Sequence, residues 1–207
     1  CASRPGLYAA YGLHPTYLHR HRPQHLVALR DWIERERPHA VGECGLDYFR
    51  DFSPRPAQRR AFELQLQIAV DTGKPLFLHQ RDAHADFMAI MKQFDGKLAA
   101  SVVHCFTGTR EELFDYLDQD WSVGITGWLC DERRGLHLRE LVKHIPANRL
   151  MIETDAPYLT PMPHRGKPNA SYLIPLTVRA LAEVKGMPLD ELCEAISANG
   201  ERAFGPW

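Results

Sequence analysis

The chain has 207 residues, a length that suits one large domain or two small ones. Its 25 basic and 26 acidic residues give a net charge of −1, which excludes a protein that binds nucleic acid across a broad cationic face. No run approaches the roughly 18 apolar residues of a membrane span, and no signal-peptide pattern opens the chain. Five cysteines without a Cys-x-x-Cys pair indicate reduced thiols, so we expect a cytoplasmic protein without membrane contact.

Hydrophobic periodicity predicts that strands and helices alternate along the chain. Apolar runs indicate strands at 6–13, 39–45, 74–79, 98–104, 121–126 and 149–155. Helices are expected at 24–37, 55–72, 83–94, 132–144, 174–185 and 188–197, with another that begins at a capping box formed by Thr109 and Glu112. Gly73 is a natural end for the second helix. No linker or low-complexity segment divides the sequence, so we expect a single domain over residues 1–207.

Apolar strands that alternate with helices are typical of an α/β fold with a parallel sheet covered by helices. A TIM-type (β/α)8 barrel has eight strands and typically ~250 residues. The six strands expected here predict such a barrel with its first two strand-helix units missing, which makes the domain incomplete at its N-terminus. The alternative is an open, doubly wound sheet, which usually concentrates its site at one crevice. We favour the barrel because candidate ligands follow four different strands.

Four expected strands each end in a residue of a type that binds metal ions: Glu43, His79, His104 and Asp155. The carboxyl ends of parallel barrel strands meet on one face, so we expect these four side chains to converge. Two imidazoles and two carboxylates suit Zn²⁺, Mn²⁺ or another borderline metal, and suit Mg²⁺ alone less readily. A single histidine at a strand end is more often a hydrogen-bonded core residue, but four such groups favour a metal site.

The alternation of side chains across a strand separates ligands from packing residues. If Glu43 points into the barrel mouth, Cys44 points outward, and the same rule places Cys105 behind His104. Both thiols are therefore expected to pack against helices and not to bind metal.

The same rule gives supporting roles to residues that share a face with the ligands. Glu153 lies on the face of Asp155, one layer deeper, and is expected to fix the orientation of a ligand. Arg81 shares a face with His79. Arg81 is an expected substrate contact, and so are Arg133 and Arg134, in a loop next to the same face. For the two neighbouring arginines, a phosphate contact and a merely solvated charge are equally open.

Several motifs taken together resemble those of the TatD family of metal-dependent deoxyribonucleases. They are Gly-Glu-Cys-Gly-Leu-Asp at 42–47, Leu-His-Gln-Arg-Asp at 78–82, Val-His-Cys-Phe-Thr-Gly at 103–108, Gly-Ile-Thr-Gly-Trp at 124–128, Cys-Asp-Glu-Arg-Arg-Gly at 130–135 and Ile-Glu-Thr-Asp-Ala-Pro-Tyr at 152–158. The resemblance extends from about residue 7 to residue 204, in the order of the family.

The resemblance implies a TIM-barrel hydrolase that uses one or two divalent ions (Mg, Mn or Zn) to hydrolyse DNA phosphodiester bonds. It further implies exonuclease action and a part in DNA repair and DNA breakdown. The weak net charge favours a short single-stranded end over a long duplex as substrate, and we expect no obligate protein partner. Transferred by motif, Glu43 bridges two metals, and His79 and His104 complete one of the two sites. Asp155 serves the other site and helps to activate water, so Glu43 and Asp155 are the expected catalytic residues. His14 is expected near the substrate phosphate, and Thr107 of the Val-His-Cys-Phe-Thr-Gly motif is a further expected substrate contact.

The sequence departs from the family pattern in two places. The family's opening strand, with its His-x-His motif, has no counterpart here. The loop at 165–171 reads Arg-Gly-Lys-Pro-Asn-Ala-Ser and lacks the acid that the family carries. Two alternatives therefore stay open: a hydrolase acting on a small amide or ester, and a catalytically impaired remnant that binds nucleic acid.

Overall fold

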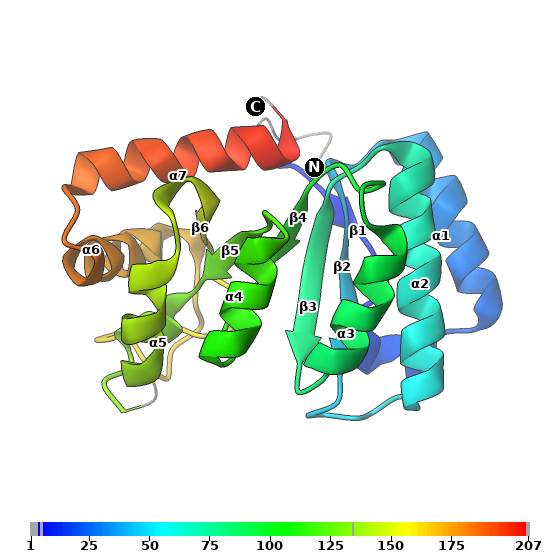
Figure 1. The fold of residues 1–207 in the computed structure, drawn as a ribbon, viewed down its shortest axis with the longest axis horizontal. Helices are drawn as coiled ribbons and strands as arrows, with labels where there is room; N and C mark the ends of the chain where they lie inside the picture. Colours follow the sequence, from blue (N-terminus) through cyan, green and yellow to red (C-terminus); the bar gives the residue numbers. More distant parts are fainter. Residues whose placement is uncertain (1–3, 5, 134, 206–207) are drawn as a thin grey trace. The chain divides into compact units, whose positions relative to one another are not determined.

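The computed structural model describes residue 4 and residues 6–133 and 135–205. Its described residues form two compact units, the first ending at Val102 and joined by residues 203–205, the second running from Val103 to Arg202. Six strands alternate with helices, and their order in the sheet, β1 to β6, is their order in the chain (Figure 1). This arrangement confirms the predicted α/β class. Among the described residues, no helix is both long and apolar enough to cross a bilayer.

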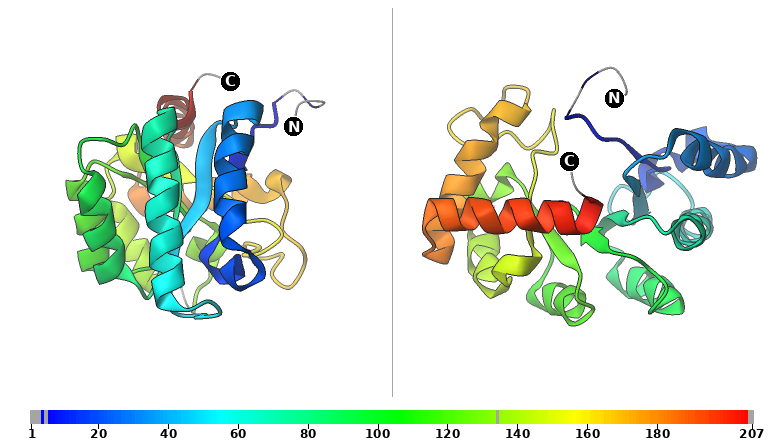
Figure 2. Two further views of the ribbon diagram at one scale, coloured as in Figure 1. Left: turned by 90° about the vertical axis from the view of Figure 1, so that its right-hand side faces the viewer. Right: turned by 90° about the horizontal axis from the view of Figure 1, so that it is seen from above.

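The first unit contains three parallel strands and the helices between them. Its elements are β1 (Ala10–Tyr11), η1 (Pro15–Arg20), α1 (Pro23–Glu36), β2 (Ala40–Asp47), α2 (Arg55–Thr72), β3 (Leu76–Arg81), α3 (His84–Met91) and η2 (Lys92–Phe94). Strand β1 pairs with β2, and β2 pairs with β3, both in parallel. Helices α1 and α2 lie side by side in both views of Figure 2. Strand β4 (Ser101–Val103) leads into the second unit.

The core of the first unit forms where α2 and α3 cover the sheet. Phe62 of α2 and Phe87 of α3 are fully buried, and their rings stack 5.2 Å apart. Strand β2 is buried along its whole length except at Glu43, which is half-buried. A Cβ atom at Gly45 would lie 1.9 Å from the carbonyl oxygen of His79, so glycine is needed where β2 and β3 approach each other. The sheet thus leaves one acidic side chain of β2 accessible.

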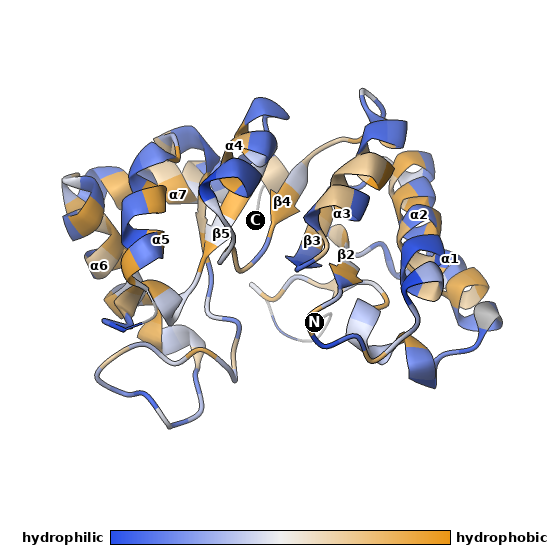
Figure 3. Cartoon of the chain, turned by 60° about the horizontal axis from the view of Figure 1, so that its bottom comes forward, coloured by the Kyte–Doolittle hydropathy of each residue, from blue (hydrophilic) through white to orange (hydrophobic). Residues whose placement is uncertain are grey.

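The second unit continues the alternation of strands and helices. It contains α4 (Arg110–Asp118), β5 (Ser122–Ile125), η3 (Gly127–Cys130), α5 (Leu136–Leu141), η4 (Val142–His144), η5 (Ala147–Arg149), β6 (Leu150–Ile152), η6 (Ser171–Leu173), α6 (Ile174–Lys185) and α7 (Leu189–Phe204). Strands β5 and β6 are parallel. Strands β4 and β5 are mainly hydrophobic, whereas α4 and α5 show mixed faces, as expected for strands covered by amphipathic helices (Figure 3).

Local signals in the sequence located several element boundaries. Helices α2 and α6 have the predicted bounds, and Gly73 ends α2 with φ of 64°. The capping box is confirmed, because Thr109 N donates to Glu112 Oε2 over 2.7 Å and Glu112 N donates to Thr109 Oγ1 over 3.3 Å.

Two predicted helix boundaries are wrong, and side-chain contacts with the backbone explain both. Helix α5 begins at Leu136 and not at 132, because the Asp131 carboxylate accepts the backbone N–H of Arg133 over 2.9 Å and holds a turn there. Helix α7 continues past 197 to Phe204. The amide of Asn199 donates to the carbonyl oxygens of Ala147 and Leu150, both over 2.7 Å, so a residue that usually ends helices is buried inside one.

Candidate metal and hydrolytic site

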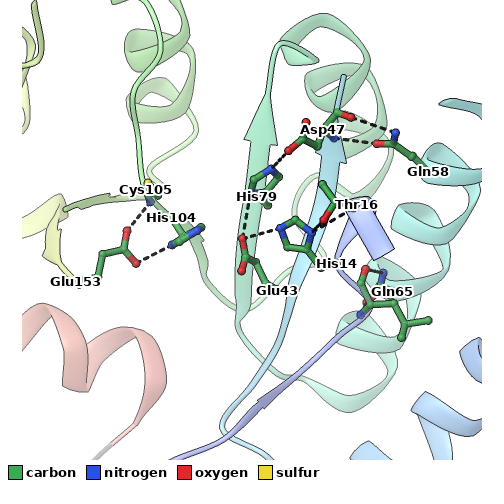
Figure 4. Close-up of polar contacts among 11 residues, drawn as sticks. His14, Thr16, Glu43, Asp47, Gln58, Gln65, His79, His104, Cys105 and Glu153 are labelled. Atoms are coloured by element: carbon green, nitrogen blue, oxygen red, sulfur yellow. Dashed lines mark hydrogen bonds and ion pairs between the residues drawn. The ribbon is translucent and has the colours of Figure 1, made fainter. Parts of the chain in front are cut away.

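In the described part of the chain, three side chains of metal-binding type come together in the first unit: His14, Glu43 and His79. Glu43 Oε1 lies 3.0 Å from Nδ1 of His79 and 3.2 Å from Nε2 of His14 (Figure 4). Their side chains are 16–27% exposed, so an ion or a substrate can reach them from solvent. Glu43 and His79 were predicted as ligands, whereas His14 was predicted to contact substrate.

Asp47, at the end of β2, lies behind His79. Its Oδ2 is 3.0 Å from Nε2 of His79, and its side chain is only 1% exposed. Burial alone would lower the pKa of His79, but the hydrogen bonds to Asp47 and Glu43 and their charges outweigh it and raise that pKa. Burial alone would raise the pKa of Asp47, but the hydrogen bonds from His79 and from Arg50 N lower it. The buried carboxylate thereby fixes the His79 ring and increases its basicity.

Two buried glutamines of α2, separated by two helical turns, hold the backbone on either side of this cluster. Gln65 accepts the N–H of Leu13 over 2.7 Å and donates to its carbonyl oxygen over 3.2 Å, which fixes the residue before His14. Gln58 makes the same pair of contacts with the backbone of Asp47, at 2.8 Å and 3.1 Å. Sequence reasoning missed both glutamines, because the only signal is a polar residue on the apolar face of an amphipathic helix.

The surroundings of His14 favour a donor role over a ligand role. The backbone N–H of Thr16 donates to Nδ1 of His14 over 3.2 Å, which places the proton of the neutral ring on Nε2. That Nε2–H points at Glu43, over 3.2 Å. His14 therefore presents a hydrogen-bond donor to Glu43, and its contact with a phosphate oxygen stays a prediction.

Cys44 is excluded as a ligand by its surroundings. The side chain is fully buried, and burial, followed by the nearby charge of Glu43, raises the pKa of its thiol. The thiol therefore stays protonated and acts as a packing group.

The second unit contains a matching pair of one imidazole and one carboxylate. Glu153 Oε2 lies 2.9 Å from Nδ1 of His104, and Glu153 Oε1 accepts the backbone N–H of Cys105 (Figure 4). A Cβ atom at Gly124 would lie 2.4 Å from Glu153 Oε1, so the absent side chain on β5 makes room for this carboxylate. This contact fixes the orientation of the His104 ring through Nδ1.

Asp155 follows β6 on a backbone of unusual conformation. Its φ is 55°, in the left-handed region that non-glycine residues rarely adopt, and φ of Cys105 is 50°. Such strain persists only where the surrounding structure holds it, and it concentrates at functional sites. The side chain of Asp155 is half-buried.

Three of the other predicted substrate contacts lie within the described residues. The guanidinium of Arg81 stacks on the ring of Phe49, with Cζ 3.8 Å from its centroid. Thr107 and Arg133 are exposed. Arg134 lies outside the described residues. The convergence of Glu43 and His79 with His104 and Asp155 stays a prediction, because the two pairs belong to different units.

Comparison with known proteins identifies the family. The family model described as TatD related DNase matches residues 1–205. A protein of Pantoea vagans named 3'-5' ssDNA/RNA exonuclease TatD is 44% identical over 207 residues, covering 98% of this chain and 80% of its own length. A protein of Citrobacter rodentium with the same name is 48% identical over 170 residues, covering 80% of this chain and 65% of its own length.

Solved structures show the same fold. The TatD homolog YJJV from Escherichia coli K12 superposes with a TM-score of 0.93 at 30% identity, covering 100% of this chain and 80% of that one. A TatD family hydrolase from Entamoeba histolytica gives a TM-score of 0.84 at 26% identity, with 97% and 75% covered. These likenesses confirm the family and the TIM-type fold expected from the motifs.

Proposed function

Because this chain belongs to the family of TatD-related DNases, we propose that it is a metal-dependent exonuclease that removes nucleotides from the 3′ end of single-stranded nucleic acid. The observation that carries the proposal is the contact of Glu43 with His79, whose ring is fixed from behind by the buried Asp47. The curated relatives named as 3'-5' ssDNA/RNA exonucleases supply the polarity and the substrate class.

The donor set fits a divalent ion. Glu43, His79 and His104 would hold one ion, and Asp155 would serve a second together with Glu43. Imidazole and carboxylate ligands suit Zn²⁺ and Mn²⁺, and Mg²⁺ would rely more on the carboxylates. Such an ion, when bound, polarises a phosphoryl oxygen and lowers the pKa of its water to about 7.

The chain's own residues prepare the reaction in distinct ways. Asp47 and Glu153 each accept a hydrogen bond from one imidazole, which fixes the ring and the nitrogen that faces the ion. His14 donates from Nε2 to a non-bridging phosphate oxygen. The carboxylate of Asp155 accepts a proton from the attacking water. These roles suit a scissile phosphate presented at the end of a flexible strand.

Cleavage of an oligonucleotide tests the proposal. A single-stranded DNA labelled at its 5′ end should shorten stepwise from its 3′ end when Mg²⁺ or Mn²⁺ is added, and EDTA should stop the reaction. His79→Ala should lower the rate at least about 100-fold, at the upper end of losses seen on disturbing a metal site. His144→Ala, at an exposed helix end in the second unit, is the matched control and should leave the rate unchanged. Cleavage that persists in EDTA or in His79→Ala would refute a metal-dependent mechanism.

A further inference from the structure

The second unit contains a pocket of about 490 Å³ that the metal ligands do not use. It lies between η3 and the loop that follows Asp155, drawn in yellow in Figure 1. The lining residues that matter chemically are Trp128, Asp131, Leu159, Met162, Arg165 and Lys167. The volume falls within the roughly 300–1,000 Å³ of small-ligand sites.

The loop that forms the pocket is tied to the segment that carries Asp155. Asn169, only 6% exposed, donates to the carbonyl oxygens of Thr154 and Tyr158 over 2.8 Å and 2.7 Å. Its backbone N–H donates to the carbonyl oxygen of Pro157 over 3.0 Å. These contacts close the loop on itself, so its wall has a defined position relative to the end of β6.

The other wall approaches the loop closely. A Cβ atom at Gly127 would lie 2.5 Å from the carbonyl oxygen of Leu159, so only glycine lets η3 pack this near. Leu159 itself has φ of 53°, a strained value for a branched residue. A strained residue held by close packing indicates a preformed pocket.

The chemistry of the lining fits one class of ligand. The half-buried Trp128 lines the pocket as its aromatic residue, and Leu159 and Met162 add apolar surface. Arg165 forms an ion pair with Asp131, and Lys167 is exposed at the rim. Two cations and one carboxylate leave a net charge of +1 (2 − 1) in the lining. An aromatic wall beside a single excess positive charge matches a nucleobase joined to a phosphate.

We propose that this pocket binds one nucleotide of a single-stranded substrate, with the base against Trp128 and its phosphate at Lys167. The inference rests on the proposed function and adds a base-binding site to it. Stacking tolerates every base, because each has a π face, so the pocket would anchor a strand without reading its sequence. The loop that forms one wall of the pocket follows Asp155 in the chain, so the pocket would hold the nucleic-acid strand on the second unit.

Binding without cleavage separates this proposal from the nuclease proposal. Fluorescence anisotropy with a labelled single-stranded oligonucleotide in EDTA measures affinity alone. Trp128→Ala should weaken binding about 5-fold to 150-fold, the range expected when stacking of about 1–3 kcal/mol is lost. Trp128→Phe should retain most of the affinity, because it keeps an aromatic face. Tyr172→Ala, which removes an aromatic ring that is 78% exposed outside the pocket lining, is the control and should bind like the unaltered chain.

A set of oligonucleotides, each with one abasic position, tests whether the lost contact is to a base. At one position, removing the base should weaken binding to the unaltered chain, and there Trp128→Ala should cause no further loss. Lys167→Gln should lower the slope of log affinity against log salt by about 1. Unchanged affinity in Trp128→Ala, or an equal additional loss at every abasic position, would overturn the proposal. Binding that follows these expectations without metal-dependent cleavage would refute only the nuclease function.

Discussion

The Oδ2 atom of Asp47 lies 3.0 Å from Nε2 of His79, while Nδ1 of the same ring faces Glu43. A buried carboxylate behind a histidine is the arrangement that orients metal-binding imidazoles and increases their basicity. Asp47 is the last residue of the Gly-Glu-Cys-Gly-Leu-Asp motif, four residues from Glu43, yet its contact with His79 appears only once β2 and β3 are paired.

Asp47→Asn should therefore weaken metal binding about 10-fold to 100-fold, because the amide cannot act as the strong acceptor that His79 requires. Isothermal titration with Mn²⁺ or Zn²⁺ measures the change. Asp51→Asn, which removes an exposed carboxylate paired with Arg55, is the control and should bind normally. Equal affinities for the two variants would show that Asp47 does not support the site.

The pKa shifts of the same pair predict how the metal-free chain responds to pH. Because folding raises the pKa of His79 above its ordinary value of 6.5, this side chain stabilises the folded state fully below pH 6.5. That stabilisation is lost as pH rises through the raised pKa. Because folding lowers the pKa of Asp47 below 3.8, this carboxylate stabilises the folded state above pH 3.8. That stabilisation is lost as pH falls through the lowered pKa. Denaturant unfolding in EDTA should show stability falling from pH 6 to pH 8.5, with a smaller fall in Asp47→Asn. A parallel fall in both proteins would contradict the pairing.

The buried glutamines of α2 give a prediction about stability. Gln65→Leu keeps the volume but leaves the N–H and carbonyl oxygen of Leu13 without their partner, at a cost of about 1–3 kcal/mol for each group. Gln67→Leu, on the exposed side of the same helix, should change stability by less than about 0.5 kcal/mol. Urea unfolding measures the free energy of unfolding of both variants. Equal losses of stability would mean that Gln65 does not hold the backbone of Leu13.

A double-mutant cycle can test whether Gly124 makes room for the Glu153 carboxylate. Gly124→Ala should displace the Glu153 carboxylate from Nδ1 of His104 and lower kcat/KM about 10-fold to 100-fold. Glu153→Ala should cause a similar loss, and the double variant should be no worse than either single variant. Additive losses would show that the two positions act separately.

The sequence allowed the fold class to be predicted for physical reasons, and it marked Glu43 and His79, whose side chains lie in contact. Apolar runs mark buried parallel strands, and an isolated Glu43 or His79 at the end of such a run has no packing role to explain it. Contacts formed by pairing distant segments were not predictable from local pattern. Gln58, Gln65 and Asp47 look like ordinary polar residues until α2 covers β2. The extension of α7 through Asn199 likewise depends on carbonyl groups about fifty positions earlier in the chain.

In the proposed metal site, Glu43, His79 and His104 bind the same ion. Calorimetric titration of Zn²⁺ into the unaltered chain, His79→Ala, His104→Ala and the double variant tests it most directly. We expect each single variant to abolish the same tight binding event, and the double variant to bind no more weakly than either one. Separate losses, in which each single variant removes a different event and leaves the other tight, would show that the two histidines bind different ions.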